Sequence, residues 1–360
     1  MKGILQAFEK AVADLSSHIA YIEKEKKLFG AVLQDIDTGQ QKRSFLENEL
    51  LSVAQLAGSG VFKRQFDYAA VVICLYGLFE NYLEVLLKRY LEVLSSTTRS
   101  YSDLPKKIRD RHVAVTSALL AKPELQKYRD IVTVESLTEN LHSCLSNQAG
   151  FVLNVEAYTY HTANFRTTAI QEFFGSVGID NLFQRVVRTT SIQEFLGGFD
   201  ADRLLRLENG GHEIFQEIND LAERRNEVSH GSVSDLLSNE RLLDYTKVVE
   251  AFGKCLFEIV SAEALSFEAS QRGVDPIRCV KVINDHIVCL EIGKDTSVSK
   301  GDVLVANLNA SALPVVGGAI LEIQIDGVDV EGVSAIDNLK IGLRIAFKAK
   351  KNQVFRLLRR

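Results

Sequence analysis

Cysteine is scarce in this sequence, and its spacing carries no pattern. The 360 residues include five cysteines and no Cys-x-x-Cys pair: Cys74, Cys144, Cys255, Cys279 and Cys289. An odd, scattered set predicts reduced, mostly buried thiols in a cytoplasmic protein, with neither a zinc site nor a catalytic thiol among them. Outside the motif described below, the histidines show no ligand spacing either. We therefore expect no metal and no cofactor.

Long apolar runs and a strong net charge are also missing. Glu9 and Lys10 interrupt the N-terminal stretch where a signal peptide needs unbroken apolar residues. The longest apolar candidate, residues 68–79, falls short of the roughly 18 residues of a membrane span, so we expect no membrane contact. The net charge of −5 gives no global signal for nucleic-acid binding and leaves only local basic surfaces. The motifs of P-loop ATPases, zinc proteases and α/β-hydrolases are absent.

Proline is rare, and the first 265 residues show long stretches of helical periodicity. Residues 4–22 place apolar side chains on one helical stripe with charges between them. We expect this first helix to break near Asp37-Thr38-Gly39, and a second, from about Arg43 to Leu56, to stop at Gly58-Ser59-Gly60. A third, from about Gln65 to Val93, is largely apolar in its first half and should lie centrally. Further helices are expected at about 104–120, 135–146, 167–176, 191–198, 213–230 and 236–268.

The character of the chain changes at about residue 270. Segments rich in Val and Ile alternate with period two, and turn signals such as Asn284-Asp285 and Asp326-Gly327 separate them. The sequence thus predicts a multidomain α + β chain, in which an N-terminal all-α helical bundle precedes a small all-β barrel. The predicted domains are 1–269, with inserted helices at about 95–200, a linker at 270–274, and a barrel with a basic tail at 275–360.

The most informative stretch is ERRNEVSH, residues 223–230, which is followed by Gly231. Arg225 comes seven residues after Ile218, only about 20° away on a helix, so it projects from the middle of an apolar stripe. A guanidinium there is costly unless an anionic or polar group meets it. Gly231 is a natural helix stop, which puts His230 on the last turn, where the helix dipole favours its protonated form. The pattern alone leaves both a solvated helix end and an active site open.

Several stretches of the sequence resemble the HEPN superfamily. The motif RNEVSH, residues 225–230, has the Arg, the following polar residue and the His of that superfamily at the expected spacing. The helix expected over 67–92 resembles the first core helix of HEPN domains and carries Glu80 in an aromatic-rich turn. Residues 162–180 are similar to an insert of a prokaryotic HEPN family linked to toxin and defence loci. The resemblance covers about residues 40–265 and implies an all-α HEPN-type bundle.

This resemblance implies a metal-independent endoribonuclease. In such enzymes a base helps the ribose 2′-OH attack the neighbouring phosphate, which gives a 2′,3′-cyclic phosphate and a free 5′-OH. It assigns His230 as general acid or base and Arg225 as the phosphate-binding residue. The resemblance also implies that Asn226 orients or hydrogen-bonds, and that the Glu80 carboxylate anchors Arg225 or His230. Because one motif supplies a single His and a single Arg, two motifs are expected to pair across a homodimer.

The resemblance also implies a biological role. Relatives of this kind act as toxins or antiviral-defence effectors, so we expect an antitoxin or a defence-system protein as partner. HEPN toxins silenced by a nucleotidyltransferase antitoxin usually carry a Tyr two residues after the His, where this sequence has Ser232. That departure argues against control by tyrosine modification.

The C-terminal segment resembles the second-domain β-barrel of translation GTPases such as elongation factor Tu. The likeness lies in VSKGDVLVA, IQIDGVDVEGV and NLKIGLRI, and it implies contact with tRNA or another structured RNA. Eight basic residues and no acidic ones occur between residues 340 and 360, which suits a phosphate backbone. We expect RNA contacts from Arg224, which turns toward the polar side of its helix, and from Lys348, Lys350 and Lys351. The alternatives are a non-catalytic HEPN interaction or regulatory subunit and a translation-associated RNA-binding protein.

Overall fold

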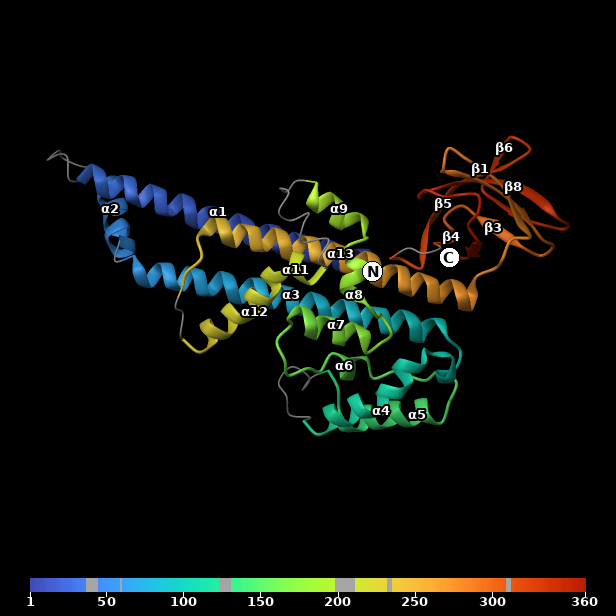
Figure 1. The fold of residues 1–360 in the computed structure, drawn as a ribbon, viewed down its shortest axis with the longest axis horizontal. Coiled ribbons are helices and arrows are strands. Elements are labelled where there is room, and N and C mark those ends of the chain that lie inside the picture. The colour runs from blue at the N-terminus through green and yellow to red at the C-terminus, as the bar shows by residue number, and fades with distance from the viewer. Residues whose placement is uncertain (37–44, 59, 123–130, 198–210, 232–234, 309–311) are drawn as a thin grey trace. The chain divides into compact units, whose positions relative to one another are not determined.

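A computed structural model describes the chain except residues 37–44, 59, 123–130, 198–210, 232–234 and 309–311 (Figure 1). The predicted helix break at Asp37-Thr38-Gly39, as well as Ser59 and Ser232, lies outside the described residues. The chain divides into two compact units. The first comprises Met1–Val85, Ala163–Ile170 and Phe195–Lys254, and the second comprises Leu86–Thr162, Gln171–Glu194 and Cys255–Arg360. The predicted domain boundaries stay a prediction.

Long helices dominate the first unit. Helix α1 spans Lys2–Ile36 and α2 spans Phe45–Gly58, while α3 (Val61–Thr97) and α13 (Asn239–Arg272) begin in this unit and continue into the second. The predicted long helices are thereby confirmed. The apolar stripe of α1 is buried as expected, through Phe8, Val12, Ile19 and Ile22.

An aromatic contact joins α1, α3 and α13 in the first unit. The Phe8 ring stacks on Tyr82 with a centroid distance of 4.1 Å, and the Tyr82 hydroxyl donates to the Gly253 carbonyl at 2.8 Å. A Cβ atom at Gly253 would lie 2.5 Å from the Phe8 ring. Glycine at this position therefore permits the close approach of α13 to the stacked rings.

Helix α3 is a core helix, as its sequence predicts. Leu75, Phe79 and Leu83 are fully buried within it. Its length and composition alone would also fit a membrane span, but 56% of its most apolar window is buried inside the protein. Packing in the core thus accounts for about half of this window, and other apolar side chains of α3 are exposed, such as Ile73 at 48%.

The helix expected over 213–230 is interrupted at Phe215. The chain forms α11 (Gly211–Ile214) and then α12 (Gln216–Ser229). Phe215 itself has a non-helical backbone (φ −107°, ψ 29°), and its fully buried ring meets Phe252 edge-on at a centroid distance of 5.0 Å. The interruption of the helix thus coincides with a residue whose ring is fully buried in the core.

The second unit contains shorter helices around a buried polar cluster. His112 is fully buried, and burial lowers its pKa to about 4. Its Nε2 accepts from the Asn154 backbone N–H at 3.4 Å, and the Asn154 side chain donates to the Leu137 carbonyl at 2.9 Å.

The short helices α6 and α8 were not expected. The helices are η1 (Tyr101–Asp103), α4 (Lys106–Leu120), α5 (Val134–Leu145), α6 (Val155–Tyr158), α7 (Thr167–Gly175), α8 (Leu182–Val186) and α9 (Thr190–Leu196), of which α7 begins and α9 ends in the first unit.

The C-terminal part of the second unit is an antiparallel sheet that curls into a half-barrel. The hydrogen-bonded order is β1-β2-β8-β5-β4-β9, with β6 paired to β5 and a separate β3-β7 ribbon. The predicted turns at Asn284-Asp285 and Asp326-Gly327 are confirmed, since all four residues have positive φ. The all-α region followed by an all-β region is therefore confirmed. The strands are β1 (Arg278–Ile283), β2 (Ile287–Ile292), β3 (Ser297–Ser299), β4 (Val303–Asn307), β5 (Val315–Ile325), β6 (Val328–Val330), β7 (Gly332–Ser334), β8 (Leu339–Ile345) and β9 (Phe355–Leu358).

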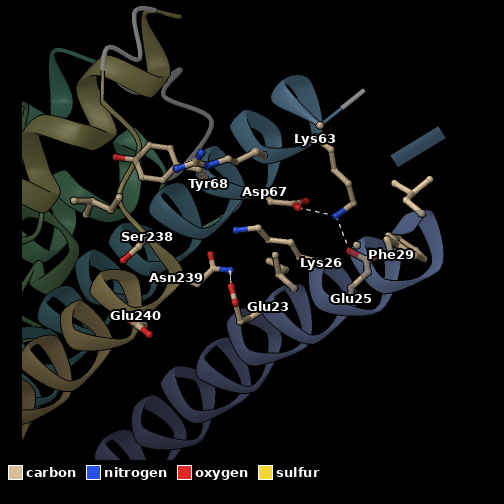
Figure 2. A pocket seen from close by; sticks show the side chains of 16 residues that line it. Glu23, Glu25, Lys26, Phe29, Lys63, Asp67, Tyr68, Ser238, Asn239 and Glu240 are labelled. Carbon is tan, nitrogen blue, oxygen red and sulfur yellow. Dashed lines mark hydrogen bonds and ion pairs between the residues drawn. The ribbon is translucent and has the colours of Figure 1, made fainter. Parts of the chain in front are cut away.

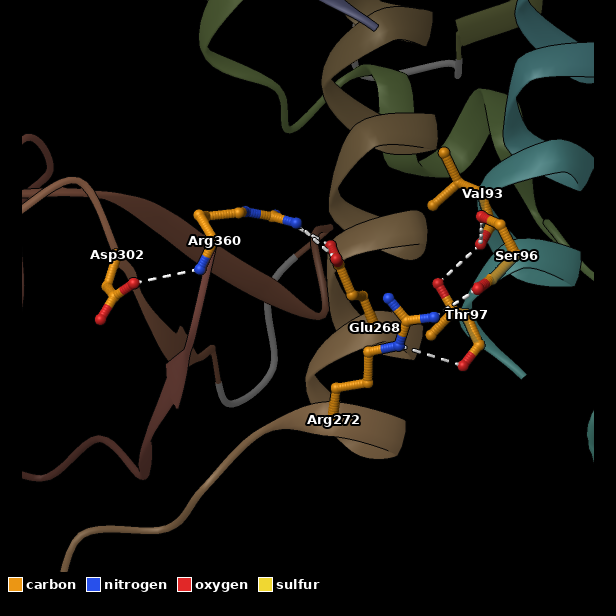
Figure 3. Close-up of polar contacts among 7 residues, drawn as sticks. All are labelled: Val93, Ser96, Thr97, Glu268, Arg272, Asp302 and Arg360. Atoms are coloured by element: carbon orange, nitrogen blue, oxygen red, sulfur yellow. Dashed lines mark hydrogen bonds and ion pairs between the residues drawn. The ribbon is translucent and has the colours of Figure 1, made fainter. Parts of the chain in front are cut away.

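Polar contacts at the end of α13 connect the helices and the sheet of this unit (Figure 3). The Arg272 guanidinium donates to the Thr97 carbonyl at 3.2 Å and also to the Ser96 carbonyl, so it caps the end of α3. On the sheet side, Arg360 pairs with Glu268 of α13 at 2.9 Å and donates its backbone N–H to Asp302 at 3.0 Å. Because carbonyl groups at a helix end lack partners inside the helix, the Arg272 contacts satisfy them.

Candidate active site

Arg225 continues the buried stripe of α12 to the edge of the core. Ile218 and Leu221 are buried, and the Arg225 side chain is half-buried. Its guanidinium lies over the ring of Tyr76 on α3, 5.4 Å from the ring centroid. This cation–π contact offsets the cost of a cation on an apolar face. Arg225 forms no ion pair with the residues that the structure describes, so its charge is available to an anion.

Tyr76 is itself held by the backbone of another segment. It is buried, and its hydroxyl accepts from the Phe165 N–H at 2.8 Å. Burial raises the pKa of Tyr76 to about 12, and the nearby Glu80 carboxylate adds to the rise. The phenol, which is neutral at pH 7 even at its ordinary pKa, offers Arg225 an aromatic face instead of a negative charge.

Glu80 lies one helical turn after Tyr76 on α3 and is half-buried. The carboxylate influences the Tyr76 ring, but within the described part of the chain neither Arg225 nor His230 forms an ion pair with it. Its predicted anchoring role stays a prediction.

His230 caps the C-terminus of α12. Its backbone N–H donates to the Asn226 carbonyl at 3.0 Å, and Gly231 follows with φ +69°, the left-handed conformation that favours glycine at a helix end. The predicted helix stop is confirmed. The imidazole is exposed and makes no hydrogen bond or ring contact with the described residues. A single α12 thus presents Arg225 and His230 without joining them, as their angular separation on one helix predicts.

Asn226 contacts a segment that is distant in the sequence. Its Oδ1 accepts a hydrogen bond from Nδ2 of Asn164, which lies 62 residues earlier. This leaves Asn226 Nδ2 without an acceptor among the described residues. The amide therefore has a free donor end beside Arg225.

The orientation expected for Arg224 was wrong. Its guanidinium is not directed to solvent: the side chain is only 14% exposed, and Nε donates to Asp220 at 2.6 Å. Nη1 donates to the Tyr68 hydroxyl at 2.9 Å and to the Asp235 carbonyl at 3.0 Å. Tyr245 also donates to Asp220. Because Tyr68 lies on α3 and Tyr245 on α13, this network ties α12 to both helices.

The pKa of Arg224 agrees with this structural role. Burial alone lowers it, but the hydrogen bonds to Tyr68 and Asp220 outweigh burial and raise the pKa above its usual value. The cation is thus fixed and compensated. RNA contact by Arg224 stays a prediction, and the geometry gives this residue a different task.

A cavity of about 490 Å³ adjoins the same network (Figure 2). It is lined by α1, the start of α3 and the start of α13, and Tyr68 forms part of its wall. Lys63 bridges Glu25 and Asp67 at 2.7 Å each, and Asn239 donates to Glu23 at 2.9 Å. These pairs connect α1 to α3 and α13 and so support the Tyr68 position.

The basic residues predicted to contact RNA through the sheet belong to the second unit. Lys348, Lys350 and Lys351 are exposed in the segment between β8 and β9. The expected basic tail is largely folded, and part of its charge is paired: Arg344 with Glu322, Arg356 with Asp275 and Arg360 with Glu268. The three lysines make no ion pair with the described residues, and their RNA contacts stay a prediction.

The family profile that matches the chain is that of RiboL-PSP-HEPN, over residues 42–262. The chain belongs to the RiboL-PSP-HEPN family. The matched range includes α12 with Arg225, Asn226 and His230, and it ends before the sheet. Neither the curated proteins nor the solved structures gave a significant match. HEPN domains are often ribonucleases, so membership supports a nuclease or other RNA-related role.

Two residues of this HEPN site were not identified from the sequence. Tyr76 lies just before the aromatic-rich turn of α3, and Asn164 lies within the segment 162–180 that resembles a family insert. The segments were singled out, but no local pattern marks which side chain faces α12. Their contacts depend on the tertiary fold.

Proposed function

We propose that this HEPN protein is a metal-independent endoribonuclease. The observation that carries the proposal is the state of Arg225. Its guanidinium is held on a neutral aromatic ring, is not neutralised by any described carboxylate, and lies five residues before a freely accessible imidazole. A positioned cation with an open side suits an anionic phosphate, and an exposed histidine suits proton transfer near neutral pH.

The proposed reaction is transesterification within the RNA strand. The 2′-oxygen forms a bond to phosphorus while the bond from phosphorus to the 5′-oxygen breaks. A neutral imidazole takes the 2′-OH proton, and a protonated imidazole gives a proton to the leaving 5′-oxygen. Arg225 binds the non-bridging oxygens, whose negative charge grows in the transition state. The products carry a 2′,3′-cyclic phosphate and a 5′-OH.

Two imidazoles are needed, and each chain has one in this motif, so we propose a homodimer. An exposed apolar stripe on α3 offers a surface for the second copy. Phe62, Phe66 and Ile73 are 78%, 64% and 48% exposed, and Gly77 continues the stripe to the position next to Tyr76. Contact along this stripe would bring a second α12 toward the first, because the stripe ends beside the site.

The oligomeric state tests this part directly. Light scattering after size-exclusion chromatography should give twice the chain mass for wild type, and Phe66→Glu and Ile73→Glu should give monomers with lost cleavage. Val328→Glu, at an exposed position of β6, is the control and should leave the dimer intact. A wild-type monomer that cleaves RNA would contradict the dimer.

The nuclease itself is tested with purified full-length protein, total RNA and tRNA in EDTA. Wild type should produce fragments with 2′,3′-cyclic phosphate ends, whereas Arg225→Ala and His230→Ala should not. The control is His286→Ala, an exposed histidine on the β1–β2 turn, which should cleave like wild type. Equal cleavage by all variants would overturn the site. RNA binding without cleavage by any variant would instead favour a non-catalytic RNA-binding protein.

The toxin or defence role, the cytoplasmic location and a partner antitoxin or defence protein remain part of the proposal. The half-barrel would then guide the nuclease to tRNA or another structured RNA through Lys348, Lys350 and Lys351.

A further inference from the structure

A short segment of the first unit runs along α12 and contacts it at successive residues. We call this segment, Asn164–Thr167, the strap. Asn164 bonds to Asn226, Arg166 pairs with Glu223, and the Thr167 N–H donates to Asn219 at 2.8 Å. As the strap advances, its partners on α12 move backward, so the two segments are antiparallel.

The partners of the strap on α12 share one face of the helix. The strap itself is turned, because the Arg166 N–H donates to the Asn164 carbonyl at 2.9 Å, and it leads into α7 at Thr167. Asn219, Glu223 and Asn226 are spaced by four and three residues, which places them on one face of the helix. The strap therefore contacts the whole length of that face.

The same strap also reaches the support of Arg225. The remaining strap residue, Phe165, donates its N–H to the Tyr76 hydroxyl at 2.8 Å, and the Tyr76 ring carries the Arg225 guanidinium. Contacts on either side of Arg225 thus come from two adjacent residues, Asn164 and Phe165. A small movement of the strap would change both at once.

We infer that Asn164 is a positioning residue that fixes the orientation of the Asn226 amide. An asparagine amide has a donor end and an acceptor end. Because Asn164 Nδ2 donates its hydrogen bond to Asn226 Oδ1, the donor end of Asn226 points away from the strap and is open to an acceptor. The inference rests on the proposed function, in which this orientation presents N–H groups to the same phosphate that Arg225 binds. The reverse orientation would present a carbonyl oxygen and repel it.

Side-chain amide exchange tests the orientation without any need for cleavage. In full-length protein labelled with ¹⁵N-asparagine, Asn164→Asp and Asn226→Asp identify the two NH₂ signals by their loss. The bonded Asn164 amide should exchange with solvent about 2- to 10-fold more slowly than the Asn226 amide. Equal rates, or slower exchange at Asn226, would overturn the inference.

Cleavage assays then test the consequence for catalysis. Asn226→Asp keeps the acceptor for Asn164 but loses the donors, so kcat should fall on the order of 100-fold with unchanged thermal stability. Asn164→Asp cannot donate, so it should lower kcat more than Asn164→Ala, although aspartate matches asparagine in shape. A merely structural role predicts the opposite order. Thr168→Ala is the control, because this exposed neighbour makes no side-chain hydrogen bond to the described residues.

The two assays separate the possible failures. If wild type cleaves no RNA, the proposed function fails and the exchange experiment alone decides the orientation. If the exchange order is as expected but all Asn164 variants cleave like wild type, the nuclease stands and the positioning role is wrong. A double variant provides the last check, because Asn164→Ala should add no further loss to Asn226→Ala if it acts through that residue.

Discussion

Replacing Tyr76 with phenylalanine and with leucine separates the two contacts that this residue makes. Phenylalanine keeps the ring under Arg225 but removes the hydroxyl that accepts from the Phe165 N–H at 2.8 Å. A buried donor without a partner costs about 1–3 kcal/mol. Leucine removes both the hydroxyl and the ring.

The expected magnitudes differ between the two variants. Both variants lose the hydroxyl, so both should exchange the Phe165 amide about 5- to 160-fold faster than wild type. This range converts the cost of about 1–3 kcal/mol at a factor of ten per 1.36 kcal/mol. Loss of the ring removes a cation–π contact of about 0.5–2 kcal/mol, so Tyr76→Leu should cleave RNA about 2- to 30-fold more slowly than Tyr76→Phe.

Hydrogen exchange read by NMR and single-turnover cleavage measure the two effects independently. Tyr76→Phe should show fast exchange at Phe165 with cleavage close to that of wild type. If both variants lose cleavage equally, the ring does not hold Arg225, and the reasoning about its support is refuted. Unchanged exchange at Phe165 would refute the role of the hydroxyl.

Other consequences follow from the same contacts. The folded-state pKa of His112, about 4, lies below the usual 6.5. The buried neutral imidazole therefore adds its full share to the free energy of unfolding above pH 6.5, and that share is lost as the pH falls toward 4. Urea unfolding should show about 2 kcal/mol less stability at pH 5 than at pH 7, and His112→Gln should flatten that change. Arg224→Lys cannot reproduce the forked contacts to Asp220 and Tyr68, so urea unfolding should show a loss of about 1–3 kcal/mol; unchanged stability would contradict the network. Expression of wild type should slow bacterial growth and His230→Ala should not, whereas equal growth would count against a toxin.

Elements with local causes could be predicted from the sequence. The stop after Gly58, the stop at Gly231 and the hairpin at Asp326-Gly327 depend on residues within a few positions, so the pattern was sufficient. The break at Phe215 could not be predicted, because no local pattern marks it and the ring that Phe215 contacts, Phe252, lies on α13. Helix α6 has four residues, too few to show a helical period.

The candidate site likewise combines features that follow from the local sequence with contacts that arise only in the tertiary fold. The stripe position of Arg225 followed from helical geometry, and so did its need for a partner. The partner itself is Tyr76, which lies on α3, and the partner of Asn226 is 62 residues away. Arg224 was wrongly assigned to the polar side because a helical wheel gives the direction of Cβ only. Its long side chain bends to Asp220 one turn earlier and reaches Tyr68 across 156 residues of sequence.

The contrast between the two neighbouring arginines carries the argument for function. Arg224 has a carboxylate, a phenol and a carbonyl as partners, whereas Arg225 has an aromatic face and no described carboxylate. Glu80 on α3 is near enough to influence the Tyr76 ring beneath Arg225, yet Arg225 forms no ion pair with the described carboxylates. Instead the helix is anchored through Arg224, while the charge of Arg225 is oriented but left unpaired. Under the proposed function, an RNA phosphate completes this arrangement, and the exposed histidine at the same helix end supplies the proton transfer.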